Sequence, residues 1–147
     1  MRKTNKGKYK PTNPKKYVGD PNGIVYRSSW ERRCMDYFDK SSTIIKWASE
    51  EVIIPYRCPF TGKRRRYFPD FVIEVMQPDK SIKTILIEVK PYKQTIAPKV
   101  QKRKTKRYIQ EVFDWGTNSN KWEAAEKYCL KRGWEFQKWT ERNMGFT

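Results

Sequence analysis

Two apolar segments of this chain each carry a carboxylate where a buried strand is expected. Asp70 follows a proline inside Tyr67–Phe71, and Glu88 directly follows the run Ile85–Ile87. A charge in such a place is costly to bury unless a metal ion, a counter-ion or hydrogen bonds compensate it. Residues two apart in a strand face the same side, so Glu88 and Lys90 should point together. A Mg²⁺-dependent phosphodiesterase needs two acids and a lysine that lie together at the edge of a sheet, and this pattern predicts such a set.

Length and charge indicate one domain with a polyanionic partner. The chain has 147 residues, and typical domains hold ~100–150. The net charge of +17 arises from 33 Lys and Arg against 16 Asp and Glu, and a charge this large acts at long range on a nucleic acid or another acidic surface. Aromatic residues make up 15% of the chain, which favours a core of large rings over a disordered polyelectrolyte. A basic, highly soluble protein without a nucleic acid partner is the alternative.

The chain has three widely spaced cysteines and no histidine. This argues against a structural zinc site and against a disulfide framework. Any metal is expected to be held by carboxylates and carbonyls, which are the ligands of Mg²⁺ or Mn²⁺. No stretch approaches the ~20 apolar residues of a membrane span, and the basic N-terminus lacks the apolar run of a secretory signal. We therefore expect a soluble intracellular protein with no membrane partner and with reduced cysteines.

The apolar pattern predicts helices at both ends of a group of strands. Ser28-Ser29-Trp30-Glu31 has the form of a capping box, which predicts a helix from Ser28 to about Ser42. Strands are expected at residues 44–47, 52–56, 64–75, 83–89 and 134–139. Two further helices are expected at 99–115 and 120–132, with Gly133 as a C-terminal cap. The expected organisation is a basic N-terminal arm of residues 1–23 followed by one domain of residues 24–147.

Positive charge is concentrated in two segments. Residues 1–23 contain little that could be buried, which predicts an extended arm that is flexible or ordered only on a partner. The helix predicted at 99–115 has an apolar face of Val100, Ile109, Val112 and Phe113, and carries the cations Lys99, Lys102, Arg103, Lys104, Lys106 and Arg107. These cations form either a contact surface for the DNA backbone or a solvated helix face. Arg27 is likewise either a phosphate contact or a surface arginine.

Glu31, Pro69-Asp70 and Glu88-Val89-Lys90 together resemble the motif of the PD-(D/E)xK nuclease superfamily. The expected element order also matches the αβββαβ core of that superfamily. The resemblance implies an α/β, restriction-endonuclease-like domain with a mixed sheet flanked by helices. Arg27–Glu31 and Phe68–Phe71 are similar to the branch that includes the Tn7-type transposon end-cleaving nuclease.

This resemblance implies a role for each matched residue. Asp70 and Glu88 would hold Mg²⁺, or Mn²⁺ in its place, helped by the backbone carbonyl of Val89. The metal would lower the pKa of a bound water and neutralise charge on the scissile phosphate. Lys90 would position the attacking water or stabilise the transition state. Glu31 would bind a second metal ion or orient Lys90.

Each of these residues also has a purely structural interpretation. Glu31 completes the capping box with Ser28, and that role is compatible with a catalytic one. Asp70 follows a proline and so fits a turn. Glu88 and Lys90 fit a solvent-facing pair at the end of a strand.

Three further segments, Gly7–Pro14, Tyr26–Glu31 and Ile45–Glu51, resemble the head-completion nucleases of T-even-like bacteriophages. This implies a Mg²⁺-dependent nuclease that trims packaged double-stranded DNA before head–tail joining. Its partners would be phage head or neck proteins, and its location the host cytoplasm during assembly or the virion. The alternatives are a basic DNA-binding assembly protein without required catalysis, and an RNA-processing or junction-resolving enzyme. The sequence leaves open the mode of cleavage and the oligomeric state.

Overall fold

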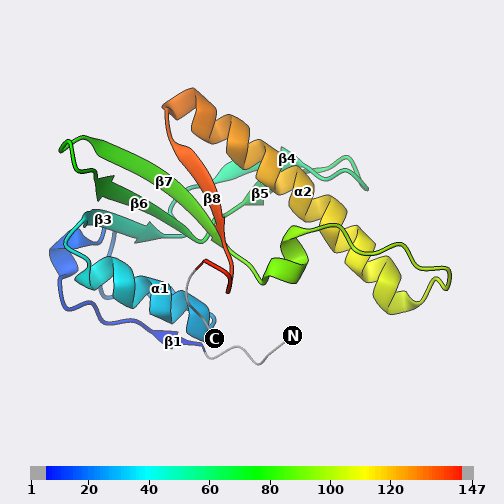
Figure 1. Ribbon diagram of the computed structural model, residues 1–147, viewed down its shortest axis with the longest axis horizontal. Helices are drawn as coiled ribbons and strands as arrows, with labels where there is room; N and C mark the ends of the chain where they lie inside the picture. The colour runs from blue at the N-terminus through cyan, green and yellow to red at the C-terminus, as the bar shows by residue number, and fades with distance from the viewer. Residues whose placement is uncertain (1–5, 144–147) are drawn as a thin grey trace.

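A four-stranded mixed sheet forms the centre of the computed structural model, which describes residues 6–143 (Figure 1). Its strands follow the order β3–β6–β7–β8 and comprise Ile44–Ser49, Phe71–Met76, Ile82–Val89 and Glu135–Trp139. Neighbours among β3, β6 and β7 are antiparallel, whereas β8 runs parallel to β7. With helices α1 (Ser29–Lys40) and α2 (Lys106–Arg132), the order α1–β3–β6–β7–α2–β8 confirms the predicted αβββαβ α/β fold.

Helix α1 covers one face of this sheet. The helix begins as the capping box predicts, because Ser28 Oγ accepts a hydrogen bond of 3.1 Å from the Glu31 N–H. The fully buried Phe38 meets Phe71 edge-to-face, with ring centroids 5.0 Å apart. Burial of such a side chain contributes ~1.5–3 kcal/mol, so this packing fixes α1 beside the N-terminal end of β6.

Helix α2 packs toward the opposite face, together with a hairpin of β4 (Ile54–Arg57) and β5 (Arg64–Tyr67). The shared core comprises Ile54, Tyr56, Tyr67, Leu86, Trp122, Ala125, Cys129 and Phe136. The helix ends at Gly133, whose φ of 70° confirms the predicted left-handed cap. Within residues 6–143, no helix is both long enough and apolar enough to cross a membrane.

The prediction of two helices after the central strands is wrong, because α2 is a single helix that begins at Lys106. Thr105 caps it by accepting a 3.1 Å hydrogen bond from the Tyr108 N–H. The predicted apolar face is exposed, and Val100 lies in the preceding loop with 89% of its surface accessible. Trp122 is buried in the core that α2 shares with the hairpin, and Trp115, on the other side of the expected break, packs against the same core. Tertiary packing of this kind overrides weak helix propensity.

The predicted strand from residue 64 to 75 is two strands in different sheets. β5 ends at Tyr67, and β6 begins at Phe71 in the central sheet. Pro69 is fully buried between them and has no N–H to donate to a ladder. The chain therefore crosses from the hairpin to the central sheet at this point, and Asp70 lies at the entrance to β6.

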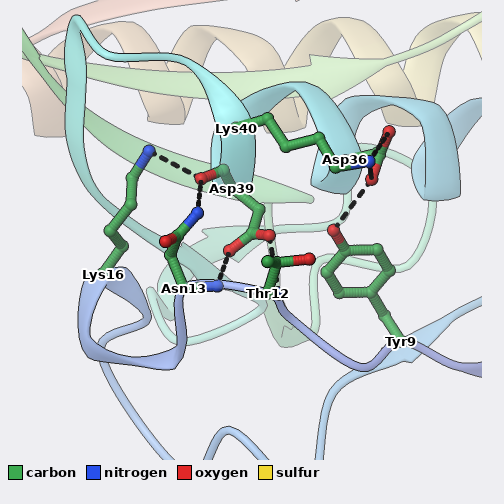
Figure 2. Close-up of polar contacts among 7 residues, drawn as sticks. All are labelled: Tyr9, Thr12, Asn13, Lys16, Asp36, Asp39 and Lys40. Carbon is green, nitrogen blue, oxygen red and sulfur yellow. Dashed lines mark hydrogen bonds and ion pairs between the residues drawn. The ribbon is translucent and has the colours of Figure 1, made fainter.

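The expectation of an arm ordered only on a partner is wrong for residues 6–23; residues 1–5 lie outside the described residues. This segment contains β1 (Gly7–Lys8), which pairs with β2 (Val25–Tyr26), and the short helix η1 (Pro14–Lys16). Tyr9 and Tyr17 are buried in the α1-side core, and the Tyr17 ring lies 4.7 Å from that of Trp47. Figure 2 shows the hydrogen bonds that join this segment to the end of α1.

The buried carboxylate of Asp39 holds the segment in place. It accepts hydrogen bonds from the backbone N–H groups of Thr12, at 2.8 Å, and Asn13, at 3.0 Å (Figure 2). The Lys16 ammonium donates to the backbone carbonyls of Asp39, at 3.0 Å, and Ser41, at 2.7 Å. The polar composition of residues 6–23 gives no sign that this segment packs on the domain. Hydrogen bonds and two tyrosine rings hold it there, rather than a run of apolar residues.

Candidate active site

Antiparallel pairing of β6 and β7 brings Asp70 and Glu88 together. Phe71 is paired with Ile87, so the residue before β6 lies beside the end of β7. Asp70 Oδ2 accepts a 2.7 Å hydrogen bond from the Val89 N–H. The backbone carbonyl of Asp70 accepts a hydrogen bond of 3.1 Å from the Glu50 N–H. These contacts fix Asp70 between strands β3 and β7.

Glu88 is buried, with only 7% of its surface accessible. Tyr67 donates a hydrogen bond of 2.8 Å from its hydroxyl to Glu88 Oε1, and the Lys90 Nζ lies 3.8 Å from Glu88 Oε2. Burial raises the pKa of Glu88, while Lys90, Tyr67 and Lys121 oppose that shift. The interpretation of Glu88 as a solvent-facing strand residue is therefore wrong.

Asp70 shares its electrostatic environment with the other predicted acids. Burial raises the pKa of Asp70 well above its ordinary value, and the negative charges of Glu88 and Glu31 raise it further. The hydrogen bond from Val89 and the ammonium of Lys90 act in the opposite direction. The fold thus gathers all four residues of the predicted motif, although they come from α1, the β6 entrance and the end of β7.

Glu31 takes part in the cap and also faces the acidic group. Its carboxylate Oε1 accepts a hydrogen bond of 3.2 Å from the Arg27 N–H. Burial raises the pKa of Glu31, and nearby Glu50 adds to the shift. Arg27 forms an ion pair with Glu50, which places its guanidinium at the edge of the site. Capping and a role in the site are therefore compatible for Glu31.

Sequence reasoning missed two neighbours of Glu88. Tyr67 reads as an ordinary strand aromatic, yet its hydroxyl orients the carboxylate. Lys121 lies on α2 with its Nζ 5.7 Å from the Tyr67 ring centroid and 5.8 Å from that of Tyr56. Burial lowers the pKa of Lys121, and Glu88 opposes this. Alternation along β5 could have indicated that Tyr67 faces inward, but nothing in the sequence links it to Lys121.

The predicted DNA-binding cations occupy a different region. Lys99, Lys102, Arg103 and Lys104 lie in the loop before α2, and Lys106 and Arg107 in its first turn; all six are exposed. In Figure 1 this loop extends away from the central sheet beside the N-terminal half of α2. The predicted role in backbone binding stays a prediction for these residues.

The donor set around Asp70 suits a hard divalent cation. Within residues 6–143 no cluster of three or more Asp, Glu or Cys side chains has the arrangement of a metal site. Mg²⁺, however, is usually bound through only one or two carboxylates and keeps several waters. The mutual repulsion that raises the pKa of Asp70 is also what a cation would relieve. The carboxylates of Asp70 and Glu88 therefore fit Mg²⁺, and the Val89 carbonyl stays a predicted ligand.

Comparison with known proteins identifies the family of this chain. The family described as TnsA-like endonuclease N terminal matches residues 41–141, which include Asp70, Glu88 and Lys90 but begin after Glu31. The chain is also 42% identical to the head completion nuclease of Enterobacteria phage T4, over 95% of each chain. The family match spans all four strands of the central sheet, and the relative matches nearly the whole chain, so the chain belongs to the TnsA-like endonuclease family.

Proposed function

We propose that this protein is a Mg²⁺-dependent DNA nuclease, with Mn²⁺ as a substitute, that hydrolyses phosphodiester bonds during bacteriophage head completion. The observation that carries the proposal is the convergence of Asp70, Glu88 and Lys90 at one end of β7. Family membership supports nuclease chemistry, and the name of the phage T4 relative supports the stage of assembly.

Each residue of the site has a defined task in this proposal. Asp70 and Glu88, with the Val89 carbonyl, would hold Mg²⁺, which supplies an activated water and neutralises charge on the phosphate. The Val89 N–H and the Tyr67 hydroxyl hold the two carboxylates in fixed orientations. The Lys90 side chain is 28% exposed, and its ammonium would provide positive charge for the attacking water or the pentacovalent phosphate. Glu31 would bind a second metal ion or help to orient Lys90.

The substrate in this proposal is double-stranded packaged DNA, trimmed before the head joins the tail. The net charge of +17 favours a polyanion. Phage head or neck proteins would be the protein partners, and the host cytoplasm or the assembling virion the location. The head completion nuclease of phage T4 supports this context through its name.

Cleavage assays test the proposal directly. Purified protein is incubated with circular and end-labelled linear duplex DNA, with Mg²⁺ or with EDTA, beside the Asp70→Ala variant. Asp79→Ala is a matched control, because Asp79 lies in the exposed turn between β6 and β7. We expect Mg²⁺-dependent cleavage that Asp70→Ala abolishes and Asp79→Ala retains, with DNA binding preserved in both variants.

Two results would contradict the proposal. Cleavage retained by Asp70→Ala would show that this site does not carry out the cleavage reaction. Tight DNA binding without cleavage by the unmodified protein would instead favour a basic assembly protein on a nuclease fold. Cutting of the circular substrate would show endonucleolytic action.

A further inference from the structure

The β4–β5 hairpin is a concentrated source of unopposed positive charge. Residues 52–69 contain five Lys or Arg and no Asp or Glu. Arg64, Arg65 and Arg66 are consecutive in β5, and all three are exposed. Among the ion pairs between residues 6–143, none involves this hairpin. Its charge is therefore available to a ligand.

The charged strand leads directly into the candidate active site. Tyr67 follows the three arginines and donates its hydrogen bond to Glu88, and Asp70 comes three residues later. Because side chains alternate along a strand, Arg65 lies on the same face as Tyr67, toward Lys121. Arg64 and Arg66 therefore lie on the opposite face of the hairpin, which is turned away from α2.

The tip of the hairpin is docked on α2. Phe60 stacks on Phe113 with ring centroids 4.4 Å apart and an angle of 25° between the rings. Gly116 leaves room for this ring, since a Cβ there would lie 2.7 Å from Phe60 Cζ. The Arg57 guanidinium also donates a 2.7 Å hydrogen bond to the Gly62 carbonyl and closes the turn. The strand that carries the arginines is thus held in a fixed position by the tip and by the bond from Tyr67 to Glu88.

We propose that the outer face of the hairpin, formed by Arg64 and Arg66, binds the phosphate backbone of duplex DNA outside the site of cleavage. The four residues of β5 span ~13 Å at ~3.3 Å per residue. That length matches about four base pairs at ~3.4 Å each. The ligand class rests on the proposed function, whereas the charge and its rigid support are properties of the hairpin itself. Backbone contacts of this kind position a duplex without reading its sequence.

The salt dependence of DNA binding tests this surface. Affinity for a fluorescent 30-base-pair duplex is measured by anisotropy over a range of salt concentrations, in EDTA so that no cleavage occurs. The variant is Arg64→Gln/Arg66→Gln. The control is Lys15→Gln/Lys80→Gln, which removes the same charge from two exposed sites. In Figure 1 the blue segment that contains η1 and the β6–β7 turn, which carry these residues, lie at the left, whereas the tip of the β4–β5 hairpin lies at the right.

We expect the hairpin variant to lower the slope of log affinity against log salt by about 1.8, since each lost phosphate contact removes ~0.9. If the variant and the unmodified protein have the same affinity when extrapolated to 1 M salt, this change in slope lowers the affinity of the variant about 60-fold at 0.1 M salt. The control should keep the slope of the unmodified protein. An unchanged slope in the hairpin variant, or an equal loss in the control, would overturn the proposal.

A second variant tests the support of the hairpin without changing its charge. Phe60→Ala removes the ring that stacks on Phe113 and should release the hairpin tip. We expect weaker DNA binding from a protein that still folds, as circular dichroism would show. Binding equal to that of the unmodified protein would contradict a role for the docked tip. Failure of the nuclease function would appear separately, as no Mg²⁺-dependent cleavage while these binding results still hold.

Discussion

The Tyr67 hydroxyl donates a 2.8 Å hydrogen bond to Glu88 Oε1 and so joins the β4–β5 hairpin to the central sheet at the candidate active site. The two residues are 21 positions apart and belong to different sheets. The hydrogen bond leaves Glu88 Oε2 directed to Lys90. The orientation of one predicted metal ligand therefore depends on an element outside the αβββαβ core.

Tyr67→Phe should reduce turnover on the order of tenfold, because it removes the hydrogen bond that orients Glu88. A hydrogen bond to a charged group contributes ~1.5–3 kcal/mol, and a tenfold change in rate corresponds to ~1.4 kcal/mol. The KM for DNA should change little. Steady-state cleavage kinetics measure both values. Tyr56→Phe is the control, since the Tyr56 ring also lies near Lys121. Equal losses in the two variants would show that the hydroxyl of Tyr67 has no special role.

Asp70→Asn should stabilise the protein at neutral pH when no divalent cation is present. Burial, Glu88 and Glu31 raise the pKa of Asp70 in the folded state, whereas the unfolded value is ~3.9. The folded protein therefore loses stability as the pH rises through the raised pKa. Asparagine does not ionise, so it avoids this loss.

Urea unfolding in EDTA at several pH values measures the difference. The advantage of Asp70→Asn should be greatest above the raised pKa and disappear as the pH falls toward ~4, where the unfolded aspartate is also protonated. Added Mg²⁺ should stabilise the unmodified protein more than the variant. A constant difference at all pH values would contradict the linkage.

Lys90→Ala should lower turnover more than it lowers metal affinity. Removal of one group that stabilises transition-state charge costs ~10²–10³-fold in turnover, while the metal ligands stay in place. Single-turnover kinetics across a Mg²⁺ titration separate the two effects. Lys93→Ala is the control, because Lys93 is exposed and lies 4.0 Å from Glu111. Loss of metal affinity without loss of turnover would exclude the proposed role of Lys90.

Neutralising Lys102, Arg103 and Lys106 together should weaken DNA binding and lower the salt slope by about 3, if each contacts one phosphate. All three are exposed in the loop before α2 or in its first turn. Anisotropy over a salt series provides the measurement, with the same duplex used for the hairpin variants. An unchanged slope would identify this cluster as a solvated surface.

Asp39→Asn should destabilise the protein by ~1–3 kcal/mol, because an amide cannot accept from both N–H groups that the carboxylate now binds. Urea unfolding measures the change. Glu123→Gln is the control, since Glu123 forms an exposed ion pair with Lys127 at 3.3 Å, and such pairs contribute ~0–1 kcal/mol. Equal effects would mean that the N-terminal segment adds little to stability.

Several parts of the fold were predictable because their signals are local. The capping box at Ser28 fixes the start of α1, and the glycine at 133 ends α2. The strand that carries Glu88 follows from a run of apolar residues. The length of α2 and the break at Pro69 were not predictable, since packing of Trp115 and Trp122 on the core shared with the hairpin continues the helix and a change of sheet divides the strand.

The sequence by itself determined the chemical types at the site: two carboxylates, a lysine and a further glutamate, in a chain of net charge +17. The spacing of residues along one strand was enough to predict that Glu88 and Lys90 act together, because strand alternation places them on the same side. Only the tertiary structure decided that Tyr67 and Lys121 lie beside Glu88. Those contacts join residues distant in sequence through packing of the hairpin on α2, and no local pattern encodes them.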